Sequence, residues 1–113
     1  TTNAIKQAAE FGIVQGGQNL AALLAFITDV NALGLKTAQG LVMTEAWYWD
    51  LNDNNREFTK KFIAQNKGSY PTMVHAGVYS AVTHYLKALE ALKSDADGAA
   101  VVAKMKEMPT DDK

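Results

Sequence analysis

The chain has 113 residues, a net charge of −1 and a hydrophobic content of 48%. This length fits one small domain, and the near-neutral charge argues against a surface built for nucleic acid or acidic membranes. The chain contains no cysteine, which excludes disulfides and thiolate metal sites. No apolar run approaches the roughly 20 residues of a membrane span.

The N-terminal residues predict a short helix followed by a break. Asn3 can cap a helix whose apolar face ends near Phe11, because its side chain can accept from the first free backbone amides. The glycines within residues 12–17 then interrupt the pattern.

The next segment is apolar and its type is open. Over residues 18–27, periodicity fits a buried strand or a buried helix. Alanine and leucine favour the helix, whereas the flanking glycines and the following Thr28 and Asp29 favour a short strand. A short helix is expected over residues 30–37, with Thr28 or Asp29 as its cap.

An apolar run that ends in three aromatic residues dominates the middle of the chain. Residues 41–47 follow Gly40 and predict a buried strand. Side chains alternate faces along a strand, so Trp47, Tyr48 and Trp49 cannot all face one core. This arrangement suits a cleft or a crossing between two lobes, and the alternative is an aromatic cluster at the edge of the core.

The second half of the chain predicts helices. The cluster of residues 52–55 forms a turn and a cap, followed by a helix to about residue 65. Pro71 is expected at the first position of a long helix that runs to about residue 92. Its apolar stripe has helical spacing and consists of Val74, Val78, Ala81, Val82, Tyr85, Leu89 and Leu92. A last short helix ends before Pro109.

These elements predict an incomplete α/β fold. Two strands seldom make a stable sheet alone, and a strand that is apolar on both faces belongs in a parallel sheet covered by helices. The neighbouring strands are not in this sequence, and both ends look cut. We therefore expect a segment of a longer protein, with exposed apolar faces that self-associate or pair with the missing part.

The order of several motifs resembles the latter part of a type I periplasmic solute-binding protein of ABC importers. The resemblance is to the branched-chain amino-acid (leucine/isoleucine/valine) receptors, and it covers nearly the whole chain. The residues that carry it are Asn3–Ile13, Phe26–Val30 with Leu33 and Gly34, Ala38–Leu41, Thr44–Asp50 and Pro71–Val82.

The resemblance implies a partial type I periplasmic-binding-protein fold: a parallel sheet flanked by helices, of which this chain is a helix-rich fragment. Residues 1–46 would end the second lobe, residues 47–50 would cross between lobes, and residues 51–113 would return to the first lobe. The implied protein is periplasmic, needs no cofactor, binds a small amino acid or aromatic carboxylate between its lobes, and delivers it to a membrane permease.

The predicted order of strands and helices and the family resemblance together suggest candidate solute contacts. Thr28 and Asp29 lie where an open α/β sheet binds ligands, at the carboxyl ends of its strands, although either can serve only as a helix cap. A carboxylate there can pair with a ligand ammonium, and the hydroxyl can donate a hydrogen bond.

The aromatic run and the long helix add further candidates. Trp47 and Tyr48 can wall a cleft, and Trp49 with Asp50 form the expected hinge. His75 and Tyr79 share one face of the long helix. Core packing is the alternative role for each of these aromatic residues.

Enzyme function is not expected. The histidines lack metal-ligand spacing, and no nucleophile or phosphate-loop motif is present. The rival interpretations are a helical module that self-associates through its apolar stripes and a sensory receptor domain of the same fold.

Overall fold

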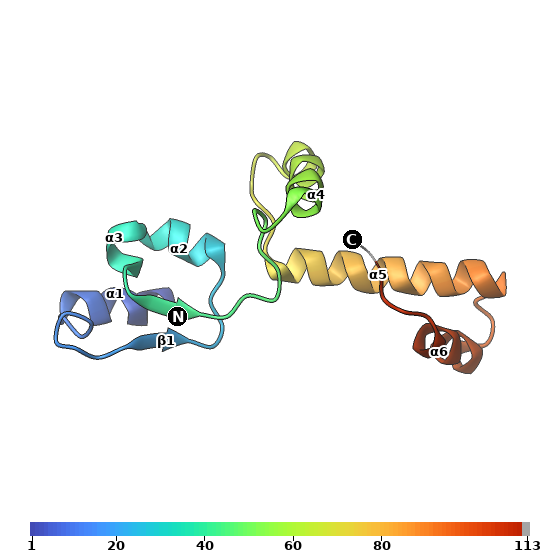
Figure 1. The fold of residues 1–113 in the computed structure, drawn as a ribbon, viewed down its shortest axis with the longest axis horizontal. Helices are drawn as coiled ribbons and strands as arrows, with labels where there is room; N and C mark the ends of the chain where they lie inside the picture. Colours follow the sequence, from blue (N-terminus) through green and yellow to red (C-terminus); the bar gives the residue numbers. More distant parts are fainter. Residues whose placement is uncertain (112–113) are drawn as a thin grey trace.

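A computed structural model describes residues 1–111 and shows an elongated molecule (Figure 1). Its extents are 59 × 30 × 22 Å and its radius of gyration is 19.0 Å, whereas a compact domain of this length has a radius of about 13 Å. Few hydrophobic residues in this part of the chain are buried: Ile5, Ala25, Ala88 and Val101. The elements therefore form small groups along an extended chain instead of one packed core.

The N-terminal group combines a parallel pair of strands with short helices (Figure 1). The strands pair with Leu20 opposite Leu41 and Ala22 opposite Met43. A chain that pairs two strands in parallel must cross back between them, and α2 and α3 form this crossover. Helix α3 packs against both α1 and α2. The bounds are α1 Thr2–Glu10, β1 Leu20–Ala22, α2 Ile27–Leu33, α3 Leu35–Ala38 and β2 Leu41–Met43.

Several boundaries in this group differ from the sequence predictions. The first helix has Thr1 as its N-cap residue, not Asn3. The next helix begins at Ile27, three residues before the expected start, so Phe26 occupies the cap position. The strand predicted over residues 41–47 is confined to Leu41–Met43, because β1 ends at Ala22 and offers no further backbone partners.

The C-terminal group is helical, with α4 at Asp53–Gln65, α5 at Met73–Leu92 and α6 at Gly98–Glu107. Helices α5 and α6 pack together, and each contributes a buried small residue, Ala88 and Val101. His84 on α5 donates from Nε2 to the carbonyl of Met105 at 2.8 Å. The fold is a helix-rich α/β arrangement with a small parallel sheet, as the sequence predicts.

Local capping explains where these helices begin. The side chains of Asn52, Thr72 and Asp97 accept hydrogen bonds from backbone amides at the starts of α4, α5 and α6. Pro71 was expected inside the long helix but precedes its cap, Thr72. Because proline is also compatible with the extended backbone before a cap, its fixed φ does not by itself locate the first helical residue.

The apolar stripe of α5 has the predicted helical spacing but is not buried. Val74, Val78 and Val82 are 51, 59 and 51% exposed. The described element that packs closely on α5 is α6, and it leaves this face uncovered.

Candidate functional site

Polar and apolar side chains gather where the two parallel strands end. Leu23 and Leu24 follow β1 and are 99 and 64% exposed. Thr28 and Asp29 lie in the first turn of α2, and Glu45 follows β2 by two residues. Because parallel strands end at the same edge of a sheet, these residues lie at the edge where open α/β sheets bind ligands.

Asp29 already has a structural task at this edge. Its Oδ2 accepts a hydrogen bond from the backbone N–H of Phe26 at 2.8 Å, and its own N–H donates to the Phe26 carbonyl at 2.8 Å. Asp29 therefore stabilises the first turn of α2 from its third position, as the acid of a capping box does. Such a carboxylate keeps lone pairs free for a second donor.

Glu45 also lies at this edge and is not among the solute contacts predicted from the sequence. Its Oε1 accepts from the backbone N–H of Ile27 at 3.1 Å. Its Oε2 is shielded from solvent and has no hydrogen-bond partner among the described residues. Desolvation raises the pKa of Glu45, the Ile27 hydrogen bond lowers it, and the nearby Asp29 carboxylate raises it, with a net upward direction. The signal available in the sequence was an acid directly after an apolar strand.

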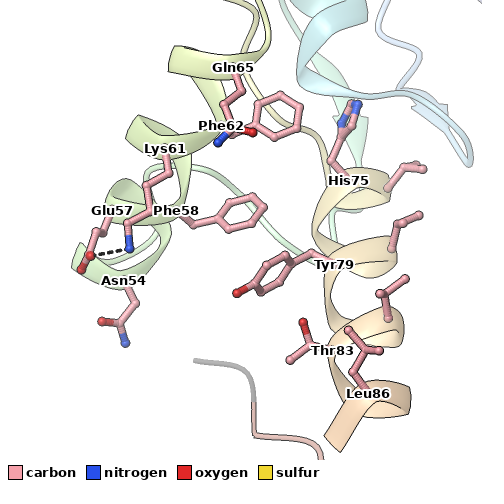
Figure 2. Close-up of a pocket in the computed structure, with 13 residues that line it drawn as sticks. Asn54, Glu57, Phe58, Lys61, Phe62, Gln65, His75, Tyr79, Thr83 and Leu86 are labelled. Carbon is pink, nitrogen blue, oxygen red and sulfur yellow. Dashed lines mark ion pairs between the residues drawn. The ribbon is translucent and has the colours of Figure 1, made fainter.

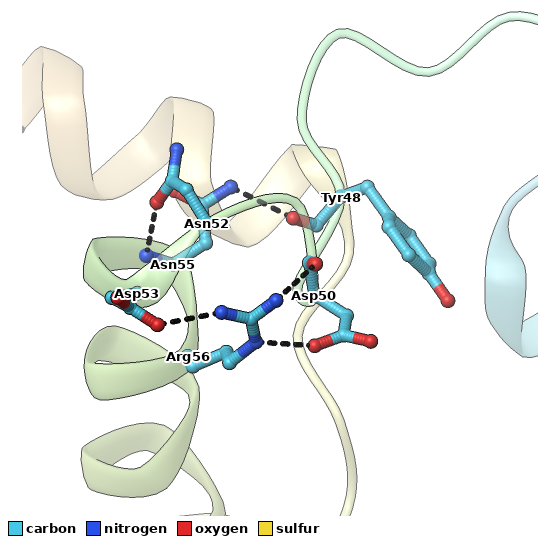
Figure 3. A network of polar contacts seen from close by, with 6 residues as sticks. All are labelled: Tyr48, Asp50, Asn52, Asp53, Asn55 and Arg56. Atoms are coloured by element: carbon cyan, nitrogen blue, oxygen red, sulfur yellow. Dashed lines mark hydrogen bonds and ion pairs between the residues drawn. The ribbon is translucent and has the colours of Figure 1, made fainter.

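The three consecutive aromatic residues point to different neighbours. Trp47 packs edge-on against Phe58 of α4, with ring centroids 5.6 Å apart. Trp49 packs edge-on against Tyr70 at 4.8 Å. Tyr48 contacts Trp49 and stays 38% exposed, and its ring points away from α4 (Figure 3). Among these three, Tyr48 is the most exposed.

Residues 44–52, the connection between β2 and α4, are held to the start of α4 by a polar network (Figure 3). The buried Asn55 donates from Nδ2 to the carbonyl of Tyr48 at 2.7 Å. Arg56 donates from Nε to Asp50 Oδ1 at 2.6 Å and from Nη2 to the Asp50 carbonyl at 3.2 Å. A further Arg56 nitrogen donates to Asp53 at 2.6 Å. The expected hinge residue Asp50 is therefore held to α4.

An open groove of about 910 Å³ lies between α4 and α5. Aromatic rings of the two helices face each other across it (Figure 2). The lining consists of Asn54, Glu57, Phe58, Lys61, Phe62, Gln65, Val74, His75, Val78, Tyr79, Val82, Thr83 and Leu86. His75 and Tyr79 belong to this groove, whereas Thr28 and Asp29 do not line it.

The contacts of His75 and Tyr79 are largely structural. The ring of His75 meets Phe62 edge-on at 4.9 Å, and that of Tyr79 meets Phe58 at 5.1 Å. His75 Nδ1 accepts from the backbone N–H of Thr72 at 3.0 Å, so the imidazole completes the cap of α5. Nδ1 is thereby an acceptor, which leaves Nε2 as the protonated nitrogen of the neutral ring.

Residues 1–111 contain neither a metal-binding cluster nor a helix that could span a membrane. No group of three or more His, Asp or Glu side chains there is placed to hold a metal ion. None of the helices in the same range combines the length and apolar character of a membrane span.

The described residues form a small parallel sheet with polar side chains at the carboxyl ends of its strands, and comparison with known proteins defines the class of protein. Residues 1–113 match a family profile described as periplasmic binding protein. A solved crystal structure of a periplasmic binding protein from Burkholderia mallei is 47% identical, covers 98% of this chain and superposes with a TM-score of 0.87. The chain belongs to the periplasmic binding protein family. It spans 29% of the length of the Burkholderia mallei protein. Comparison with curated proteins gave no match.

Proposed function

We propose that this chain is the C-terminal portion of an extracytoplasmic solute receptor of the branched-chain amino-acid type, which serves an ABC importer. Residues 1–46 form the end of the second lobe. Residues 47–50 cross between the lobes, and residues 51–113 belong to the first lobe. The receptor binds its solute between the lobes without chemical conversion and presents it to a membrane permease. The family match over the whole chain supports this assignment.

The observation that carries the binding function is the chemistry of the carboxyl edge of β1 and β2. Thr28 and Asp29 from α2 stand at this edge, where the ligand of an open α/β sheet lies. The Asp29 carboxylate can accept a solute ammonium or hydroxyl in addition to the Phe26 amide, since an ionised carboxylate has about four acceptor positions. The Thr28 hydroxyl can donate to a solute carboxylate.

The apolar groups of the same edge favour a solute with an apolar or aromatic body. Leu23 and Leu24 follow β1 and are exposed, and Tyr48 presents a partly exposed ring at the start of the crossing. Flat aromatic and aliphatic surfaces of this kind line pockets for apolar ligand bodies. Branched-chain and aromatic amino acids and aromatic carboxylates are the solute classes that fit.

The other candidate contacts contribute less to this proposal. Trp47 packs on Phe58, and Tyr79 packs on the same ring, so both shape the support of the crossing. His75 keeps Nε2 available while Nδ1 caps α5, and it remains a proposed contact from the first-lobe side.

Isothermal titration of the full-length receptor tests the proposal. L-leucine, L-phenylalanine and 4-hydroxybenzoate are the probes, with L-serine as a polar control. We expect binding of at least one of the apolar probes and at least tenfold weaker binding of L-serine. Tight binding of L-serine alone would refute the apolar preference, and a full-length protein that binds no small solute in a wider screen would refute the receptor function.

Substitutions that preserve the local fold test the two polar contacts. Asp29→Asn keeps an oxygen acceptor for the Phe26 amide but removes the charge, and Thr28→Val keeps the shape but removes the hydroxyl. We expect Asp29→Asn to weaken the binding of an amino acid more than the binding of an aromatic carboxylate, because only the amino acid carries an ammonium group. Equal affinity of the wild type and both variants for all probes would contradict the assigned contacts.

A further inference from the structure

Two carboxylates hold neighbouring amides of the loop that leads into α2. Asp29 accepts from the N–H of Phe26 at 2.8 Å, and Glu45 accepts from the N–H of Ile27 at 3.1 Å. Asp29 lies three residues away, within the same turn, whereas Glu45 lies 18 residues away, beyond β2. Glu45 therefore links the first turn of α2, which contains Thr28 and Asp29, to the beginning of the connection.

The connection is attached to α2 at Glu45 and to α4 from Trp47 onward. Tyr48 and Asp50 are hydrogen-bonded to Asn55 and Arg56 of α4, and Trp47 packs on the same helix through Phe58. Glu45 is hydrogen-bonded to the α2 side.

Ala46 stands between these two anchored stretches. Its N–H faces the sulfur of Met73 at 3.3 Å, and thioether sulfur is a weak acceptor. Ala46 has no side chain that anchors it and is held through this weak acceptor, whereas the side chains of Glu45 and Trp47 anchor the residues before and after it.

We propose that Glu45 is a positioning residue that fixes the start of α2 (Phe26–Asp29) to the connection, and that the connection bends at Ala46. This inference rests on the proposed receptor function. A bend at Ala46 moves Trp47–Asp50 with α4 as one body, and Glu45 stays with the sheet edge. The start of α2 then keeps its position relative to Glu45 while the lobes close, because the Glu45–Ile27 hydrogen bond does not have to break.

Hydrogen exchange of the unliganded full-length receptor tests the positioning directly. In Glu45→Ala the Ile27 amide loses its acceptor, and we expect its exchange to accelerate at least tenfold. Glu45→Gln keeps an oxygen acceptor, so exchange there should stay within about threefold of the wild type. Glu10→Ala, an exposed acid on α1, is the matched control. Unchanged protection of Ile27 in Glu45→Ala would overturn the proposal.

Solute titration supplies the functional readout, with the apolar probe that binds the wild-type protein. The loss of one orienting hydrogen bond predicts roughly three- to tenfold weaker binding in Glu45→Ala, with recovery in Glu45→Gln. Equal losses in both variants would overturn the positioning role, because the charge itself would then be required. If no probe binds the wild type, the proposed solute class fails, while the exchange measurement still decides the role of Glu45.

The bend is tested by spin labels placed on the exposed residues Lys36 and Lys60, one on each side of the connection. We expect Ala46→Pro, which fixes φ and removes the N–H, to reduce the change in label distance on solute binding by at least half. Ala46→Gly is the control, because glycine keeps the N–H and leaves φ free, so the full distance change should remain. A full distance change in Ala46→Pro would overturn the assigned bend.

Discussion

The guanidinium of Arg56 holds Asp50 through both its side chain and its backbone, with Nε 2.6 Å from Oδ1 and Nη2 3.2 Å from the carbonyl oxygen. These contacts tie the end of the connection to the first turn of α4. They require the planar fork of arginine, because a lysine ammonium is a single charged point on a flexible stem.

Arg56→Lys should therefore loosen the connection while retaining the charge. Both partners are more than 40% exposed at the side chain, at 44 and 43%, so only a small fall in the urea midpoint is expected. That fall should be largest in low salt and shrink near 1 M salt, where the screening length is about 3 Å. Lys61→Ala, which removes an ion pair within α4, is the control. A large loss that is insensitive to salt would contradict this account.

Asn55 should matter more than Arg56, because it is buried. It is 6% exposed, and its Nδ2 is 2.7 Å from the Tyr48 carbonyl. Asn55→Ala leaves that carbonyl without its partner, which predicts a loss of about 1–3 kcal/mol in the free energy of unfolding. Asn54→Ala, one residue away and exposed, should change it by less than about 0.5 kcal/mol. Urea denaturation measures both, and equal effects would show that the Tyr48 contact is unimportant.

His75 can be tested for its capping and ligand roles separately. Its Nδ1 accepts from the Thr72 amide at 3.0 Å, at the position where capping boxes carry Glu or Gln. His75→Gln should thus keep the stability of α5, whereas His75→Ala should cost about 1 kcal/mol in chemical denaturation. Solute affinity that falls in His75→Gln at unchanged stability would identify a ligand contact. Unchanged affinity would leave His75 as a cap alone.

Local signals in the sequence account for the accurate part of the prediction. The Asn52 cluster and the apolar stripe predicted both helices, and the predicted ends at residues 65 and 92 are those of α4 and α5, because capping and helical spacing depend on residues one turn apart. The strand over residues 41–47 was predicted too long, because strand length is set by the partner, and β1 ends at Ala22.

The sequence predicted only those residues of the candidate site whose position directly follows an apolar run. Thr28 and Asp29 were predicted as solute contacts because they come after an apolar run, part of which forms β1, and this role stays a prediction. Glu45 was missed because its partner, Ile27, is 18 residues away, and the parallel register that brings them together is not encoded in any local pattern. His75 was expected as a ligand contact, and its capping bond was missed because histidine replaces the usual Glu or Gln of the motif.

Gly40 should be the least replaceable glycine before β2. Its φ is +82°, and an added Cβ would lie 2.8 Å from Cγ1 of Val14. Gly34 has the same φ of +82° with nothing within 4 Å, and its ψ of 147° places it in a region that essentially only glycine occupies. Gly34→Ala therefore measures the backbone strain alone, about 1–3 kcal/mol. Gly40→Ala should cost about 1–3 kcal/mol more from overpacking, and Val14→Ala in the same chain should recover part of that excess. Equal losses at the two glycines in urea denaturation would contradict the steric argument.

Glu45 predicts a specific dependence of stability on pH. Its folded pKa lies above the ordinary value of 4.5, mainly because of desolvation. Between 4.5 and the raised value the folded protein therefore holds more protons than the unfolded chain, and its free energy of unfolding falls as pH rises through that interval. The stabilisation that comes from protonated Glu45 is complete below the pKa of the unfolded chain and is lost above the pKa of the folded protein.

Glu45→Gln removes this titration, because the amide does not ionise. The free energy of unfolding of the wild type minus that of Glu45→Gln should decrease as pH rises above 4.5 and then level off once Glu45 is ionised in the folded protein. Urea denaturation of the full-length receptor from about pH 4 to pH 8 measures the difference, with Glu10→Gln as the exposed control. A difference that rises with pH would mean that the folded protein stabilises the ionised carboxylate, through a donor that outweighs the desolvation of Oε2 and the charge of Asp29.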